Sequence, residues 1–144
     1  MIVVDVNLLI YSYSRQFAQH DTARNWLETQ FNTTRVALPW SSLLGFIRVL
    51  TNARIFGKPE STSAAWSRVK EWLQRDNVWI PEPGEKHLEI LESLLLLPGI
   101  SNKLIPDAHI AALAIEHGLT LYSTDNDFAR FPGLRWVNPL APKK

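Results

Sequence analysis

Four aspartates stand at positions from which carboxylates commonly act in catalysis. Asp5 directly follows an apolar run at the N-terminus, and Asp125 and Asp127 follow a second such run at residues 119–122. Asp107 stands in the first turn of a predicted helix, where the helix dipole favours a carboxylate. Each of them alone can be explained as a helix cap or as a partner of the dipole, so only the set points to chemistry.

The chemistry open to such a set is metal-dependent hydrolysis. Carboxylates that several elements bring to one edge of a sheet repel one another unless a cation or protons neutralise them. The chain has no cysteine and no cluster of histidines, so its candidate ligands are oxygens, which suit Mg²⁺ or Mn²⁺ rather than zinc. A hard cation on carboxylates, with waters left over, is a common apparatus for hydrolysing phosphodiesters.

Strand and helix patterns alternate along the chain, which predicts the elements that position these aspartates. Short apolar runs predict strands at residues 2–4, 36–38, 78–80, 119–122 and 136–137. Helical periodicity predicts helices near 8–11, from 21, from 41 or 42, from 61 or 62, at 85–97 and at 106–118. This alternation indicates a parallel sheet covered on both faces, with its site beyond the carboxyl ends of the strands.

The predicted helix boundaries depend on capping residues. The expected N-caps are Asn7, Asp21, Ser41 or Ser42, and Ser61 or Thr62. Pro106 is expected to be the first residue of the last helix, and Gly118 is expected to end it.

Length and composition predict one soluble domain. The chain has 144 residues, 46% of them hydrophobic and 20% charged, so we expect a single domain at residues 1–138 and a frayed tail at 139–144. No run approaches the roughly 20 apolar residues that cross a bilayer, and no signal peptide is evident, which predicts a cytoplasmic protein without membrane contact. The net charge is only +1, but no acidic residue stands between Glu28 and Glu60. The basic residues there indicate either a phosphate-binding face or an ordinary solvated surface.

Four segments, taken in order, resemble one known family. They are residues 4–11 (VDVNLLIY), 39–48 (PWSSLLGFIR) followed by Thr51-Asn52, 105–114 (IPDAHIAALA) and 123–134 (STDNDFARFPGL). Each segment is unspecific alone, but the ordered set spans nearly the whole chain. On these segments the chain resembles PIN domains, and in particular the VapC toxins of bacterial type II toxin–antitoxin pairs.

The resemblance implies a fold, an activity and partners. The fold is α/β, a three-layer PIN-like architecture with a four- or five-stranded parallel sheet flanked by helices. The activity is that of a toxin endoribonuclease that depends on Mg²⁺ or Mn²⁺ and hydrolyses RNA with a metal-activated water. A cognate VapB-like antitoxin would block the site, and because toxins of this type commonly dimerise, a homodimer is expected.

The resemblance also implies roles for single residues. The family's catalytic and metal-binding acids correspond to Asp5, Asp107 and Asp125, with Asp127 as a further metal-binding neighbour. The expected supporting residues are Asn7, Ser123 and Thr124, and the expected contacts to RNA or antitoxin are Arg48, Asn52 and Arg54. Leu43 departs from the pattern, because many PIN domains carry a glutamate at that place.

Two other functions stay open at this stage. A degenerate PIN domain would bind RNA or a partner protein without cleavage, and Leu43 in place of an acid is the argument for it. A phosphatase with Asp5 as covalent nucleophile would want a second acid where the chain has Asn7, and a lysine to balance the phosphate. His109 follows Asp107 by two residues and so faces another side of the helix, where it is expected to pack or to support the site.

Overall fold

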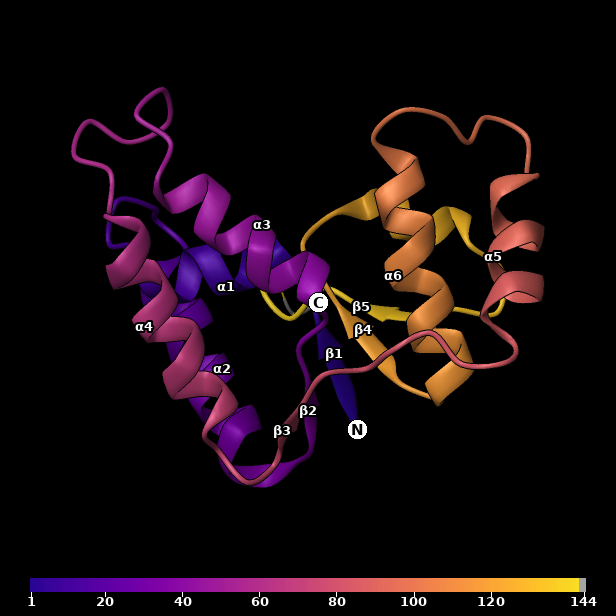
Figure 1. Cartoon of the computed structure of the whole chain (residues 1–144), viewed down its shortest axis with the longest axis horizontal. Coiled ribbons are helices and arrows are strands. Elements are labelled where there is room, and N and C mark those ends of the chain that lie inside the picture. Colours follow the sequence, from indigo (N-terminus) through magenta and orange to yellow (C-terminus); the bar gives the residue numbers. More distant parts are fainter. Residues whose placement is uncertain (143–144) are drawn as a thin grey trace.

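The computed structural model describes residues 1–142, and a parallel sheet of five strands forms its centre (Figure 1). The strands are β1 (Ile2–Val4), β2 (Val36–Ala37), β3 (Val78–Trp79), β4 (Thr120–Tyr122) and β5 (Arg135–Val137). Their order across the sheet is β3-β2-β1-β4-β5, and every neighbouring pair is parallel. The predicted α/β class and its parallel sheet are therefore confirmed.

Helices cover both faces of this sheet. They are α1 (Val6–Tyr13), α2 (His20–Thr33), α3 (Trp40–Leu50), α4 (Thr62–Leu73), α5 (His87–Leu95), α6 (Leu104–His117) and the 3₁₀ helix η1 (Asn126–Arg130). Helices α1 to α4 lie to one side of the strands, and α5 and α6 lie to the other (Figure 1). The molecule therefore has the three layers that the sequence predicts.

The first strand shows how the sheet divides the interior into two hydrophobic cores. Ile2 and Val4 pack in the core beneath α1 to α4, whereas Val3 packs in the core beneath α5 and α6. This alternation follows from the pleat of a strand, which points successive side chains to opposite faces. Because both faces are covered, the strand is apolar at every position.

The strand order places a switch point beside the first strand. The chain proceeds outward from β1 to β2 and β3, and then crosses to β4 on the other side of β1. In open sheets of this kind, ligands bind beyond the carboxyl ends of the strands at such a switch point. Asp5 directly follows β1 and Ser123 directly follows β4, so both stand at this place.

The predicted caps of the first two helices are wrong. Helix α1 is capped by Asp5 rather than by Asn7, because Asp5 has an extended backbone and its side chain accepts a hydrogen bond from the Val6 amide. Helix α2 begins one residue before Asp21 and has no side-chain cap, so Asp21 lies in its first turn. In both cases the chain enters the helix earlier than the local pattern indicates.

Of the predicted boundaries of the later helices, some are confirmed and others are wrong. Helix α3 starts before either predicted serine, and Ser42 instead donates to the Val4 carbonyl across the core at 3.0 Å. Ser61 caps α4 as predicted. Pro106 is the third residue of α6 rather than its first, a position still inside the turn where backbone N–H groups lack helical partners. Gly118 ends α6 in the left-handed conformation, at φ 67°, as expected.

The end of the chain returns to the body of the molecule. Leu140 is half-buried and packs against the core beneath α1 to α4. Residues 143–144 of the predicted tail lie outside the described residues. None of the helices in residues 1–142 combines the length and the apolar character that crossing a membrane requires.

Candidate active site

Asp5 is held at the carboxyl end of β1 by contacts to both of its side-chain oxygens. Oδ1 accepts a hydrogen bond from the Val6 amide at 2.8 Å, and Oδ2 accepts one from the Ser123 hydroxyl at 2.8 Å. Its backbone amide continues the pairing of β1 with β4 by donating to the Tyr122 carbonyl at 3.0 Å. The carboxylate is therefore fixed in direction before any ligand binds.

Ser123 joins three residues of the site through one hydroxyl group. It is fully buried, and its Oγ donates to Asp5 while it accepts from Asn7 Nδ2 at 3.3 Å and from the Asp125 amide at 3.0 Å. A serine hydroxyl has one donor and two acceptor positions, so its capacity is used in full. Thr124 is half-buried, and within residues 1–142 its side chain makes no recorded hydrogen bond, so Ser123 is the one of the two that organises the acids.

Asp107 reaches the same place from the first turn of α6. Burial and then the negative charges of Asp5 and Asp125 raise its pKa to about 6, while Lys103 opposes the shift. Burial also raises the pKa of Asp5, against the hydrogen bonds from Ser123 and Val6, and Asp125 raises it further. The three aspartates therefore lie near enough to share one electrostatic field.

Asp127 is engaged differently from the other three acids. Its Oδ2 lies 2.7 Å from Lys103 Nζ, and its Oδ1 lies 3.6 Å from Arg130 Nε. Its backbone amide donates to Asp125 Oδ1 at 2.9 Å. Lys103 lowers the pKa of Asp127, which keeps this carboxylate ionised beside the other acids. Sequence reasoning missed Lys103, because nothing in its local pattern indicates a partner 24 positions later.

The donor set fits an open magnesium site rather than a closed metal cage. Among residues 1–142, no three His, Cys, Asp or Glu side chains lie close enough to enclose a metal ion by themselves. Mg²⁺ commonly uses only one or two carboxylates and takes its other ligands from water and phosphate. Asn7 Oδ1 is buried beside Asp5 and has no hydrogen-bond partner in the described residues, so it offers one more hard oxygen to such an ion or its water.

Leu43 lies in the hydrophobic core. Its side chain is 0% exposed, and it belongs to the cluster beneath α1 to α4 that includes Val4 and Leu8. The next residue on the helix, Leu44, is 57% exposed. Leu43, which the sequence resemblance aligns with a glutamate of many PIN domains, therefore serves as apolar packing in this chain.

The remaining candidate residues lie around the site rather than in it. His109 Nδ1 lies 3.2 Å from Nε2 of His87 on α5, so it packs between two helices. Arg48 is exposed on the last turn of α3, and the Asn52 side chain accepts a hydrogen bond from the Arg54 amide at 2.9 Å in the loop that follows. Within residues 1–142, none of these four candidate residues forms a hydrogen bond or an ion pair with the four aspartates.

The sequence matches a known family over almost its whole length. A family model described as the PIN domain matches residues 2–134. The chain therefore belongs to the PIN domain family, and the resemblance inferred from its four segments is confirmed.

Within that family, the chain is similar to VapC ribonucleases. It is 40% identical over 141 residues to Ribonuclease VapC33 of Mycobacterium tuberculosis, covering 97% of this chain and 99% of the relative. It is 36% identical over 142 residues to Ribonuclease VapC37 of the same species, covering 98% and 99%.

Solved structures share the fold at lower identity. The structure of VapBC2 from Rickettsia felis bound to a promoter DNA fragment matches with a TM-score of 0.71 at 22% identity, over 96% of this chain and 98% of that chain. The structure of FitAB bound to the IR36 DNA fragment matches with a TM-score of 0.69 at 16% identity, over 100% and 99%. At these identities, the likeness concerns the fold alone.

Proposed function

We propose that the chain is an endoribonuclease that depends on Mg²⁺ or Mn²⁺ and acts as the toxin of a toxin–antitoxin pair. The observation that carries this proposal is the network at Ser123, which orients Asp5 and Asp125 beside an Asp107 whose pKa is raised to about 6. The names of the relatives support a ribonuclease. Membership of the PIN family sets the phosphatase alternative aside.

Each acid has a separate part in the proposed reaction. Asp5, Asp107 and Asp125 would hold the metal ion, either directly or through water, and Asp127 with its partner Lys103 borders them. When bound, the ion lowers the pKa of a water and stabilises the charge that develops on the phosphate. Ser123 keeps Asp5 and Asp125 in position, and the expected products carry 5′-phosphate and 3′-hydroxyl ends.

The experiment that tests this proposal is RNA cleavage by the purified protein. Cleavage is expected with Mg²⁺ or Mn²⁺, and it should stop with EDTA or with Asp5→Asn, which keeps the size of the side chain but removes its charge. Asp76→Asn is the matched control, because Asp76 is exposed and lies outside the site. Cleavage that continues in Asp5→Asn would show that another group does the chemistry.

A cognate VapB-like antitoxin and a homodimer complete the proposal. The solved structures that share the fold include a toxin–antitoxin complex from Klebsiella pneumoniae, which supports a partner of this kind. Co-expression with the product of the neighbouring reading frame tests it. A stable complex that abolishes RNA cleavage is the expected result, and the mass of the free toxin in solution tests the dimer.

A degenerate domain that binds RNA or a protein without cleavage is the second candidate. The observation in its favour is Leu43, which supplies packing where an acid is usual in the family. The cleavage assay separates the two, since this candidate binds RNA and leaves it intact with either metal.

A further inference from the structure

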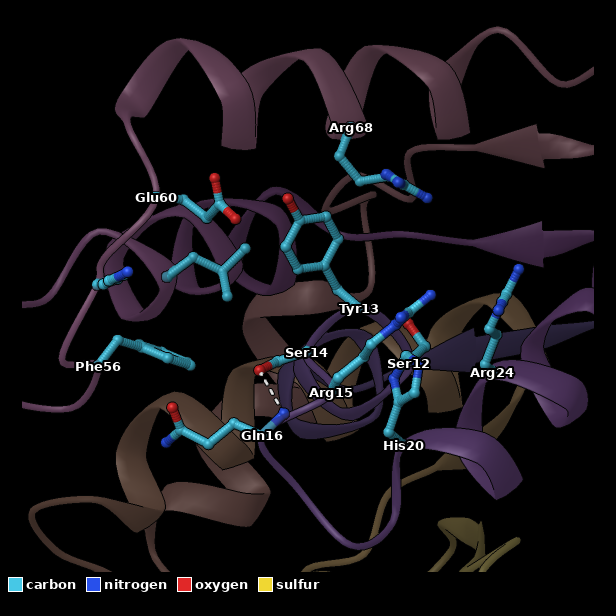
Figure 2. Close-up of a pocket in the computed structure, with 12 residues that line it drawn as sticks. Ser12, Tyr13, Ser14, Arg15, Gln16, His20, Arg24, Phe56, Glu60 and Arg68 are labelled. Atoms are coloured by element: carbon cyan, nitrogen blue, oxygen red, sulfur yellow. Dashed lines mark hydrogen bonds between the residues drawn. The ribbon is translucent and has the colours of Figure 1, made fainter.

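A cavity of about 530 Å³ lies at the end of α1 that is remote from Asp5 (Figure 2). It is bounded by the last residues of α1, the start of α2, the loop between α3 and α4, and α4 itself. The residues that line it are Ser12, Tyr13, Ser14, Arg15, Gln16, His20, Arg24, Leu50, Phe56, Lys58, Glu60 and Arg68. None of the four aspartates of the candidate active site is among them.

The lining of this cavity is strongly cationic. Arg15, Arg24, Lys58 and Arg68 contribute four positive charges, and Glu60 contributes one negative charge, which leaves a net +3. Within residues 1–142, Arg15, Arg24 and Lys58 have no recorded ion pair, and all three are exposed. Arg68 is partly engaged, because it lies 3.5 Å from Glu71 and its guanidinium lies 5.1 Å over the Tyr13 ring. Uncompensated cations from separate elements around one opening favour an anion with several charges.

The character of the lining favours RNA over a helical protein segment. A groove that receives an amphipathic helix is largely apolar, whereas Leu50 and Phe56 are the aliphatic or phenyl side chains among the twelve lining residues. The rest are hydroxyl, amide, aromatic-polar and charged groups. Half-buried Phe17 lines an adjoining cavity of about 320 Å³, which shares Arg15 and Arg24. Phe17 packs edge-on against Tyr11 and Phe56, so the contact offered to RNA is mainly electrostatic, and a positively charged groove is the usual track for the backbone of single-stranded nucleic acid.

Helix α1 connects this cavity to the acids. Asp5 caps one end of the helix, and the cavity begins at Ser12 near the other end. Eight helical residues at about 1.5 Å each span about 12 Å. A chain that places one phosphate at the aspartates can therefore bring a phosphate a few nucleotides away to the arginines.

We propose that this cavity binds a backbone phosphate of the RNA substrate, at a distance from the bond that is cut. The proposal rests on the ribonuclease function, whose chemistry it does not change. It gives Arg15 and Arg24 the task of holding RNA, and it leaves the phosphodiester bond to the aspartates.

The test compares RNA binding by the purified protein and by two double variants. A short fluorescein-labelled single-stranded RNA of mixed sequence is titrated in EDTA, so that it is bound but not cut, and the salt dependence of Kd is measured. Arg15→Ala with Arg24→Ala should raise Kd on the order of 10-fold and reduce the slope of log K against log salt by about 0.7, since each phosphate that the protein neutralises contributes about 0.7 for a single strand. Lys70→Ala with Lys86→Ala is the control, because it removes the same charge from exposed positions outside the cavity. It should change Kd and the salt slope much less.

A third variant tests whether removing a negative charge from the cavity strengthens RNA binding. Glu60→Gln removes the carboxylate of the cavity, so it should lower Kd for the same RNA on the order of 3-fold. A variant that merely disturbs the fold would not tighten binding. If Glu60→Gln weakens RNA binding, the proposal is overturned.

A small substrate separates this proposal from the proposed function. Hydrolysis of bis-p-nitrophenyl phosphate with Mn²⁺ involves only the acids, so it should be the same in the arginine variant and the unchanged protein. If the unchanged protein cleaves neither this ester nor RNA, the ribonuclease function fails while the binding titration still decides about the cavity. If the arginine variant binds RNA like the lysine variant, the cavity is no RNA site, and a selective loss of binding to a glutamate-rich peptide would assign it to a protein partner instead.

Discussion

At the scale of residues, one serine and one lysine define the arrangement of the acids. Ser123 contacts Asp5, Asn7 and Asp125 through a single hydroxyl, so it fixes their relative positions before a cation arrives. Lys103 lies 2.7 Å from Asp127 and keeps that carboxylate ionised at the border of the site. Neither residue is an acid, but each contacts a carboxylate and helps to hold it in position.

Ser123→Ala tests the role of this hydroxyl. The variant leaves the Asp125 amide and the Asn7 side chain without a partner, which costs about 1–3 kcal/mol of the free energy of unfolding for partly buried groups. Activity should fall about 10- to 100-fold, as expected for residues that orient metal ligands. Ser67→Ala is the control, because its hydroxyl bonds only within α4. RNA cleavage equal to that of the unchanged protein would remove Ser123 from the mechanism.

Asp107→Asn should stabilise the metal-free protein at high pH. The pKa of Asp107 is about 6 in the folded protein and near its ordinary value of 3.8 in the unfolded chain, so the stability of the native protein falls as the pH rises through this window. At about pH 8 the variant avoids this loss, so its free energy of unfolding should be higher by about 1 kcal/mol. The gain is smaller than the full pKa shift would give, because solvent screens a half-exposed group. Urea unfolding at high pH and at about pH 4 measures the difference.

The same titration should control the metal binding that we propose. A protonated Asp107 cannot hold a cation, so the affinity of the unchanged protein for Mn²⁺ in titration calorimetry should rise as the pH increases through about 6 and then level off. Mn²⁺ should also stabilise the unchanged protein more than Asp107→Asn. An affinity that stays constant from about pH 5 to pH 8 would contradict a metal-binding role for Asp107.

At the scale of elements, α3 supplies apolar packing at Leu43, the position that the sequence resemblance aligns with a glutamate of many PIN domains. Leu43 is fully buried in the core with Phe46 and Leu50, at the spacing of one helix face. Leu44, the next residue along the helix, is exposed to solvent. The adjacent pair therefore allows one substitution to be compared in two environments.

Leu43→Glu should destabilise the fold without improving metal binding. It places an unpaired charge in the core and should cost several kcal/mol of the free energy of unfolding, of order 3 or more. Leu44→Glu, on the exposed side, should stay within about 0.5 kcal/mol. Thermal unfolding measures both. If Leu43→Glu instead keeps its melting temperature and tightens Mn²⁺ binding in calorimetry, the residue faces the acids after all.

At the scale of the whole molecule, the strand order unites the two ends of the chain. β1 pairs with β4, which places Val4 opposite Tyr122 and brings Asp5 next to Ser123 from 118 positions away. α6 contributes Asp107 from the layer on the other face of the sheet. The acids therefore come together only when both layers are packed on the sheet.

Growth arrest on expression reports on this assembled site. Asp5→Ala and Asp107→Ala should each relieve the arrest while the protein remains folded, and Asp5→Ala should cost about 1 kcal/mol because it removes the cap of α1. Asp76→Ala should still arrest growth. Circular dichroism of the purified variants checks the fold. Arrest that persists in a folded Asp5→Ala protein would mean that toxicity does not depend on RNA cleavage.

The sequence by itself determines the strands, the class of fold and the acids. The apolar run at residues 2–4 predicts a buried strand because burial on both faces demands apolar side chains at every position, and the segment 119–122, with Leu119 and Leu121, predicts a second strand. Asp5 and Asp125 follow those runs, and parallel strands end at one edge, so the place of the site can be predicted as well.

The tertiary structure alone decides which groups touch. Whether Asp5 or Asn7 caps α1 depends on where the first strand stops, and the pairing of Ser123 with Asp5 depends on the order of strands in the sheet. The ion pair of Lys103 and Asp127 and the arginine-lined cavity need elements that are distant in sequence to meet. Local sequence patterns indicate which residues are buried and which backbone conformation they prefer. Which side chains contact one another depends on how the elements pack in the tertiary structure.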